Sequence, residues 1–114
     1  MKKIKTGVIG VGYLGNYHAQ KYANLPHAEL VGVCDANEDR VNEIANMLST
    51  QAFTNYHALV DQAEAVSIAT TTPMHFEIAK YCLENNTHVL VEKPITTTVD
   101  EAEVLIQLAK ANNL

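Results

Sequence analysis

The sequence has little cysteine and little positive charge, and both shortages limit what the protein does. Its two cysteines, Cys34 and Cys82, lie in apolar stretches without paired spacing, so we expect neither a disulfide framework nor a zinc site. Reduced thiols of this kind indicate a cytoplasmic protein. The net charge of −5 repels phosphate backbones and anionic lipids. We therefore expect no metal, no nucleic acid and no membrane among its partners.

Long hydrophobic runs are also missing, because glycines interrupt the most apolar segment. The chain starts MKKIKTGVIGVGYLG, in which lysines and apolar residues imitate a signal peptide, but no small-residue cleavage site follows. No stretch approaches the length of a membrane span. With 47% hydrophobic and 18% charged residues in 114 positions, the composition is that of one ordinary globular domain. We expect residues 1–114 to form this single domain.

What the sequence does contain is an alternation of short apolar runs and segments with helical period. The runs span Ile4–Ile9, Leu30–Cys34, Ala65–Ala69 and His88–Val91, with a weaker candidate at Gln51–Phe53. Tyr56–Val60 adds one or two helical turns. Elsewhere apolar residues recur at helical spacing in three sets: Val41, Ile44, Ala45 and Leu48; Phe76, Ala79 and Leu83; and Ala102, Leu105, Ile106 and Ala109.

This alternation predicts an α/β fold of the Rossmann type. We expect a doubly wound parallel sheet of about five strands, in the order 3-2-1-4-5, with helices on both faces. The runs are apolar almost throughout, as strands covered on both faces require. Asn37, which two acids follow, and a capping box from Thr98 to Glu101 mark two of the helix starts.

A G-x-G-x-x-G motif connects the first strand to the segment that follows it. The first glycine permits a tight turn, the second lets the backbone approach a pyrophosphate, and the third lets the helix pack closely on the sheet. The N–H groups at the helix start would then bind phosphates. The alternative is a glycine-rich turn without a ligand. The motif makes five residues candidates for cofactor binding: Gly10, Gly12, Tyr13, Leu14 and Gly15.

Asp35 follows the second strand at the spacing that the dinucleotide fingerprint requires. Its carboxylate would accept hydrogen bonds from the adenosine ribose and repel a 2′-phosphate, which favours NAD over NADP. Two alternatives stay open. Asp35 caps the next helix instead, or Arg40 reaches a 2′-phosphate and NADP binds as well.

Two further strands end at the same edge of the predicted sheet, where ligands bind in open parallel sheets. The fourth strand leads into a threonine loop that adds polar candidates for the cofactor site: Thr70, Thr71, Thr72, Pro73 and His75. This loop is equally suited to starting a helix, with Thr72 or a neighbour as its cap. The fifth strand leads into Glu92, Lys93 and Pro94, and the first two are candidates as well.

Lys93 is the candidate catalytic residue. At the mouth of a strand beside a nicotinamide, its ammonium group can donate a hydrogen bond to a substrate oxygen and stabilise charge that develops there. The alternative is an exposed lysine that protects the edge of the sheet from pairing with other chains.

These segments together resemble the N-terminal domain of the Gfo/Idh/MocA oxidoreductases, the family of glucose–fructose oxidoreductase and inositol dehydrogenase. The resemblance covers all 114 residues and rests on GVIGVGYLGNYHA, VGVCD, SIATTTPMHFEIA and HVLVEKPI. It implies a domain that binds NAD or NADP in a dehydrogenase acting on a sugar, polyol or related hydroxyl. It also implies that Lys93, placed by Glu92 and Pro94, contacts the substrate and the nicotinamide region.

The resemblance has two departures. Thr71 stands where the family loop usually has its first proline. The second domain, which carries the substrate pocket in family members, is absent from this chain, so we expect the chain alone to bind cofactor without turnover. A small-molecule substrate therefore belongs to a longer parent protein, and the oligomeric state is open, a homo-oligomer included.

Two other functions compete with the dehydrogenase. A stand-alone NAD-binding or sensing module would need no more than this domain, whereas a methyltransferase would leave the Glu-Lys-Pro triplet and the threonine loop without a role. Among the other polar residues, we expect His18, Tyr17 and Tyr22 to pack around the first helix. His27, His57 and His88 show no metal-binding spacing.

Overall fold

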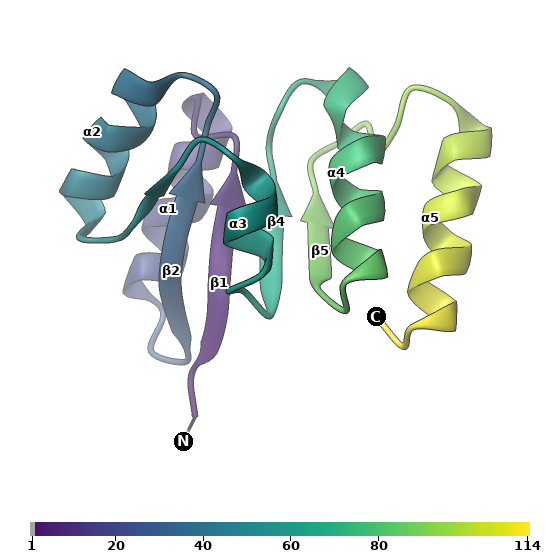
Figure 1. Ribbon diagram of the computed structural model, residues 1–114, viewed down its shortest axis with the longest axis horizontal. Helices are drawn as coiled ribbons and strands as arrows, with labels where there is room; N and C mark the ends of the chain where they lie inside the picture. The colour runs from purple at the N-terminus through teal and green to yellow at the C-terminus, as the bar shows by residue number, and fades with distance from the viewer. Residues whose placement is uncertain (1) are drawn as a thin grey trace.

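The computed structural model describes residues 2–114, which build one parallel sheet between two layers of helices (Figure 1). The strands are β1 (Ile4–Ile9), β2 (Ala28–Cys34), β3 (Ala52–Phe53), β4 (Ala65–Ile68) and β5 (His88–Val91). The helices are α1 (Tyr13–Asn24), α2 (Glu38–Leu48), α3 (Tyr56–Val60), α4 (Thr72–Glu84) and α5 (Val99–Ala111). The order β3-β2-β1-β4-β5 confirms the predicted topology.

Three strand boundaries differ from the sequence-based expectation. Strand β3 begins at Ala52 rather than Gln51. Strand β2 begins at Ala28, because its lower end pairs with β1 from Ile4 onward even though the exposed Glu29 interrupts the apolar pattern. Strand β4 ends at Ile68 rather than Ala69. Apolar runs report burial rather than backbone pairing, so errors of this size fall where a strand leaves the core.

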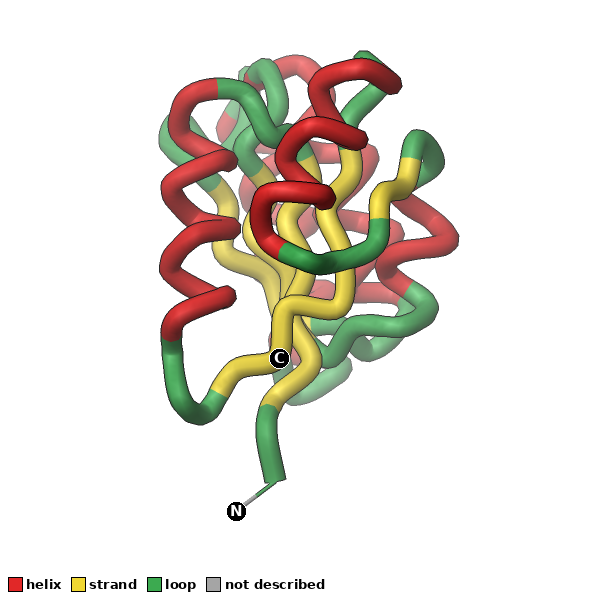
Figure 2. Tube along the Cα trace, turned by 90° about the vertical axis from the view of Figure 1, so that its left-hand side faces the viewer, coloured by secondary structure: helices red, strands yellow, loops and turns green. Residues whose placement is uncertain are grey.

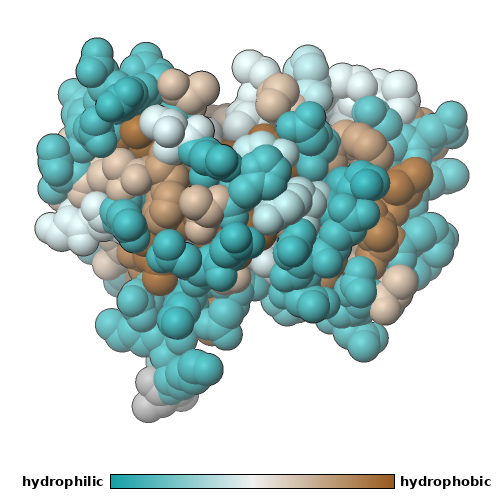
Figure 3. Space-filling model, viewed as in Figure 1, coloured by the Kyte–Doolittle hydropathy of each residue, from teal (hydrophilic) through white to brown (hydrophobic). Residues whose placement is uncertain are grey.

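Helices cover both faces of the sheet (Figure 2). Each face has its own hydrophobic core. The alternation of side chains along β1 sends Val8 into the core under α1 and α2, and Ile9 into the core under α3 and α4. Helix α5 packs on α4 through the buried Leu105. Figure 3 shows a largely polar surface on one side of the molecule, with apolar side chains gathered near α5.

Three helix starts carry the side-chain caps that their sequences favour. Asn37 accepts a hydrogen bond from the Arg40 N–H, and Asn55 accepts one from the His57 N–H. Thr98 accepts one from the Glu101 N–H at 3.2 Å, as predicted. The second half of the expected capping box differs, because the Glu101 carboxylate accepts from the hydroxyl of Thr97 instead.

Within residues 2–114, no helix combines the length and the apolar character needed to cross a membrane.

Candidate functional site

The candidate site lies at the carboxyl edge of the sheet, between β1 and β4. These neighbouring strands run parallel, and the chain leaves β1 for α1 on one face and β4 for α4 on the other. Their diverging connections leave a crevice at this edge, the position where open α/β sheets bind ligands. The segments that follow β2 and β5 end at the same edge (Figure 1).

The three motif glycines do three different things in this crevice. Gly10 has a φ of +90°, and a Cβ there would lie 2.8 Å from the backbone of Ala69. A Cβ on Gly15 would lie 1.6 Å from the Gly10 carbonyl oxygen, so the helix packs directly on the loop. A Cβ on Gly12 would meet nothing within 4 Å. Gly10 and Gly15 therefore build the loop, and Gly12 leaves its open side free for a ligand to approach.

Asp35 fixes the glycine loop to the end of β2. Its Oδ2 accepts a hydrogen bond from the Val11 N–H at 2.9 Å, and its Oδ1 accepts one from the Asn37 N–H at 2.9 Å. Asn37 is the residue that caps α2, so Asp35 is not that helix's N-cap. Each carboxylate oxygen can accept a further bond, so the acid is still able to bind a ribose hydroxyl.

Arg40 is occupied by contacts within the protein. Its Nε donates to the Val11 carbonyl at 3.0 Å, and one guanidinium nitrogen pairs with Glu43 at 2.8 Å. Val11 is thus held through both of its backbone polar groups, because Asp35 binds its N–H and Arg40 binds its carbonyl oxygen. The sequence pattern allowed Arg40 to reach a 2′-phosphate, and in this structure two of its guanidinium nitrogens already bind Val11 and Glu43.

Helices α1 and α4 differ from the other three helices at their starts. The N-caps of α1 and α4, Gly12 and Thr71, make no side-chain capping bond, and α4 begins with Thr72 and Pro73. Both helices start at the crevice, and their first N–H groups lack partners within the helix. The missing side-chain caps therefore leave two partial positive charges beside the space where a pyrophosphate would lie.

A cavity of about 510 Å³ opens between the glycine loop, the end of β2 and the start of α4. Of the predicted residues, it is lined by Gly10, Gly12, Asp35, Thr70 and Thr71. It is also lined by residues that sequence reasoning missed: Ile9, Cys34, Ala36, Thr54, Tyr56, Ala69, Met74 and Ile78. Thr54 and Ala69 follow directly after β3 and β4, and this position at the end of a strand could have identified them. Tyr56 comes from α3, and no motif predicts its contribution.

The walls of this cavity are uncharged apart from Asp35. Burial, followed by the nearby charge of Asp35, raises the pKa of the Cys34 thiol to about 12. Burial and the hydrogen bond to Glu77 raise the pKa of Tyr56 to about 12. Both groups therefore stay neutral at pH 7, and Cys34 has no thiolate with which to act as a nucleophile.

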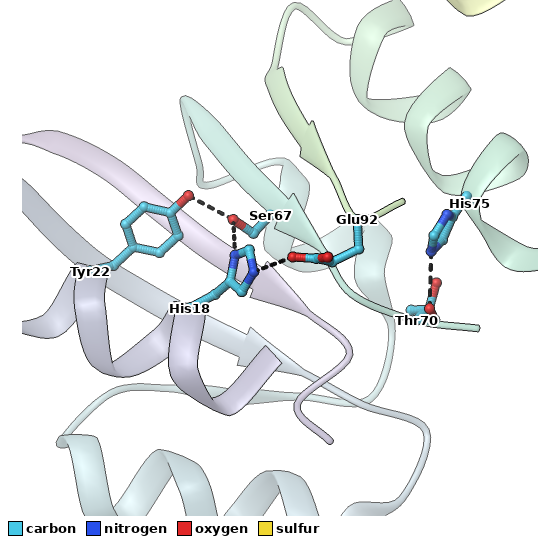
Figure 4. Close-up of polar contacts among 6 residues, drawn as sticks. All are labelled: His18, Tyr22, Ser67, Thr70, His75 and Glu92. Carbon is cyan, nitrogen blue, oxygen red and sulfur yellow. Dashed lines mark hydrogen bonds and ion pairs between the residues drawn. The ribbon is translucent and has the colours of Figure 1, made fainter. Parts of the chain in front are cut away.

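The remaining predicted residues do not line this cavity. Tyr13 and Leu14 are exposed on the first turn of α1. His75 is 1% exposed, and one of its ring nitrogens lies 3.0 Å from the Thr70 carbonyl (Figure 4). Its other ring nitrogen lies 3.0 Å from the Pro94 carbonyl. His75 therefore ties the loop after β4 to the segment after β5 and is too deeply buried to reach a ligand as the structure stands.

His18 and Tyr22, expected to pack around the first helix, take part in a polar chain on the opposite face of the sheet (Figure 4). His18 Nε2 lies 2.7 Å from a carboxylate oxygen of Glu92, and Nδ1 lies 3.0 Å from Ser67 Oγ. The Tyr22 hydroxyl lies 2.6 Å from the same Ser67 oxygen. Sequence reasoning missed Ser67 because a single serine in an apolar strand gives no signal. The Glu92 carboxylate is thus bound by a histidine of α1.

Lys93 is exposed, immediately beyond the end of β5 at the carboxyl edge of the sheet. Among residues 2–114, β5 forms one margin of the sheet. The position agrees with both interpretations of Lys93, a substrate contact and an edge-strand charge. The described residues contain no group of three or more His, Cys, Asp or Glu side chains suited to holding a metal ion.

A parallel sheet with this strand order, a glycine loop at the switch point and an acid after β2 defines the class of the protein: a dinucleotide-binding domain of the Rossmann type. The chain belongs to the Gfo/Idh/MocA family. The family model "Oxidoreductase family, NAD-binding Rossmann fold" matches residues 4–114.

Individual relatives agree with this assignment. The chain is 44% identical to UDP-N-acetylglucosamine 3-dehydrogenase of Acidithiobacillus ferrooxidans over 114 residues, which is all of this chain and 36% of that protein. A structure of that enzyme superposes with a TM-score of 0.95 over 100% of this chain and 37% of its own. Inositol 2-dehydrogenase of Rubrobacter xylanophilus is 33% identical over 93% of this chain and 31% of that protein.

A further solved structure contains both cofactor and substrate. Scyllo-inositol dehydrogenase from Lactobacillus casei, with bound NAD(H) and scyllo-inositol, is 26% identical and has a TM-score of 0.91 over 98% of this chain and 34% of its own. The chain therefore spans about a third of the length of these relatives.

Proposed function

We propose that this chain is the cofactor-binding part of a dehydrogenase that oxidises a hydroxyl group of a sugar, a polyol or a related compound. The observation that carries the proposal is the crevice at the carboxyl edge of the sheet, where the glycine loop, Asp35 and the threonine loop surround one cavity. The relatives named as dehydrogenases of a nucleotide sugar and of inositol support the substrate class.

The residues of the chain divide the work of holding NAD. The loop at Gly12 and the open starts of α1 and α4 would bind the pyrophosphate, and the Asp35 carboxylate would accept from the adenosine ribose. NAD is preferred over NADP, because Asp35 opposes a 2′-phosphate and Arg40 is engaged with Val11 and Glu43. When bound, NAD accepts the hydride that leaves the substrate carbon.

Lys93 has the catalytic role in this proposal. Its ammonium group would donate a hydrogen bond to the reacting substrate oxygen and stabilise negative charge there during oxidation. The remaining substrate contacts would come from a second, C-terminal domain, since the matched relatives are about three times as long as this chain. The 114-residue chain alone is then a binding domain without turnover, because proximity contributes only when cofactor and substrate are both fixed.

Two measurements test the proposal. Calorimetric titration of the chain with NAD and NADP at equal ionic strength should give tighter binding of NAD, and the absence of binding by either would refute the cofactor site. The longer protein that contains this chain should reduce NAD with at least one substrate from a panel of nucleotide sugars, sugar phosphates and inositols. NAD binding without any turnover there would support the alternative of a sensing module.

A further inference from the structure

The segment that carries Lys93 is held by histidines on both of its flanks. The residue before it, Glu92, pairs with His18 Nε2 at 2.7 Å from α1 on one face of the sheet. The residue after it, Pro94, has its carbonyl oxygen 3.0 Å from His75 Nδ1 of α4 on the other face. Lys93 itself is exposed. Its position is therefore set by contacts that its neighbours make.

The His18 contact belongs to a hydrogen-bond chain that satisfies every member. With the ring proton on Nε2, His18 donates to Glu92, and its Nδ1 accepts from the Ser67 hydroxyl. Ser67 in turn accepts from the Tyr22 hydroxyl at 2.6 Å. With this tautomer, each hydrogen bond between these four side chains joins one donor to one acceptor. The imidazole is thus held in one orientation, with its N–H directed at the carboxylate.

Enzymes with a serine nucleophile also contain a hydroxyl, an imidazole and a carboxylate in this order, but Ser67, His18 and Glu92 do not form such a catalytic centre. Ser67 is 0% exposed and lies in the middle of β4, with Tyr22 bound to its oxygen. A substrate carbonyl has no access to that oxygen. What the chain does is fix the carboxylate of Glu92 at the end of β5.

That end of β5 has little else to hold it on the α1 face. Val89 and Val91 pack into the core under α4, so the alternating residues His88, Leu90 and Glu92 point to the opposite face. Leu90 is 55% exposed there, which means that no apolar cover extends over this part of the strand. The pair between His18 and Glu92 therefore supplies the side-chain contact that anchors the end of β5 to α1.

We propose that His18 is a positioning residue for the dehydrogenase reaction, acting through Glu92 to set where Lys93 stands at the crevice. This inference rests on the proposed function, because it gives the position of Lys93 a role in catalysis. His18 and Glu92 act as one unit, and the loss of either moves Lys93 away from the reacting oxygen. The proposed pyrophosphate and ribose contacts are at Gly12, the N-cap of α1, and at Asp35, which follows β2, and they stay in place because neither residue contacts Glu92 through a hydrogen bond.

The test uses the full-length protein and a double-mutant cycle. His18→Ala and Glu92→Ala should each lower kcat by about 10- to 100-fold, which is the cost of a misplaced catalytic group. The Kd for NAD should change by less than about twofold, because a change in kcat alone reflects an interaction made in the transition state. The double variant should be no worse than either single variant, because both changes remove the same contact.

Conservative variants separate positioning from general damage. The amide oxygen in Glu92→Gln still accepts from His18, and the amide N–H in His18→Gln still donates to Glu92, so both variants should recover most of the lost kcat. Lys80→Ala breaks an exposed ion pair of 3.0 Å with Glu84 on α4 and serves as the control, with kcat unchanged. If the alanine variants do not fold, nitrogen NMR of His18 in the wild type should report an Nε2-bound proton, which the chain requires.

Three outcomes would overturn the inference. They are unchanged kcat in the alanine variants, effects that multiply in the double variant, and a neutral His18 whose only ring proton is on Nδ1. An inactive Lys93→Met variant beside active His18 variants would reject this inference and leave the proposed function standing. A wild-type protein that oxidises no substrate in the panel would reject the proposed function and this inference with it.

Discussion

Gly15 sits so close to Gly10 that a Cβ on Gly15 would lie 1.6 Å from the Gly10 carbonyl oxygen, whereas a Cβ on Gly12 would meet nothing within 4 Å. This contrast gives a matched pair of variants.

Gly15→Ala should destabilise the domain by about 3 kcal/mol or more, because the obstacle is backbone rather than a movable side chain. Gly12→Ala should change the unfolding free energy by less than about 0.5 kcal/mol, yet weaken NAD binding by placing a methyl group where the pyrophosphate approaches. Denaturant unfolding and NAD titration of both variants check this, and a stable Gly15→Ala would contradict it.

Asp35 should contribute to NAD binding in two ways. Asp35→Ala removes the ribose acceptor and also the acceptor for the Val11 N–H, so we expect NAD affinity to fall by about 1–3 kcal/mol. Asp35→Asn keeps one oxygen for a backbone N–H and removes the negative charge, so it should lose less NAD affinity and discriminate less against NADP. Calorimetry with both dinucleotides measures this. Equal loss of NAD affinity in the two variants would show that charge, rather than loop geometry, dominates.

The two thiols should make the domain lose stability in alkaline solution. Burial raises the pKa of Cys34 and of Cys82 to about 12 in the folded chain. Their stabilising contribution is complete below the ordinary thiol pKa of about 8.5 and is lost as the pH rises from there toward 12. From pH 8 to pH 10 the unfolding free energy should therefore fall by roughly 2 kcal/mol per thiol. Urea unfolding at several pH values tests this, and Cys82→Ala should remove one of the two contributions. A Cys82→Ala profile parallel to that of the wild type would count against this origin.

Lys93→Met in the full-length protein should reduce turnover far more than NAD binding. The change keeps much of the apolar stem and removes a donor and a positive charge, which is worth roughly 3–4 kcal/mol of barrier when aimed at a reacting oxygen. We expect kcat to fall by about 100- to 1,000-fold, with little change in the Kd for NAD. Lys80→Met on α4 is the matched control. Undiminished turnover would mean that Lys93 only protects the edge of the sheet.

The strand order and the glycine loop could be predicted from the sequence because each has a local cause. Apolar runs report which strands are buried, and the spacing of Gly10, Gly12 and Gly15 reports a turn in which Gly10 and Gly15 leave no room for a side chain. The link between His18 and Glu92 could not be predicted, since it joins residues 74 positions apart in the sequence. Ser67 could not be predicted either, because the residues next to it in the sequence do not indicate whether its hydroxyl binds Tyr22 or water.

The contacts of Arg40 could not be predicted for a related reason. From the sequence, an arginine a few residues after the ribose-binding acid is free to meet a phosphate, and only the fold shows that the Val11 carbonyl lies within its reach. The position of Asp35 after β2 was predictable, whereas its bond to the Val11 N–H depends on how closely the ends of β1 and β2 approach.

Because Asp35 and Arg40 both hydrogen-bond to the backbone of Val11, the ways in which the cofactor preference can evolve or be redesigned are restricted. A change toward NADP calls for an uncharged residue at position 35 and a free cation nearby, and both side chains needed for that exchange already support the loop. A substitution at either position that removes the bond to Val11, such as Asp35→Ala, would therefore lower affinity for both dinucleotides. A viable route must first replace the support for Val11 by other contacts, so the order in which mutations accumulate matters as much as their identity.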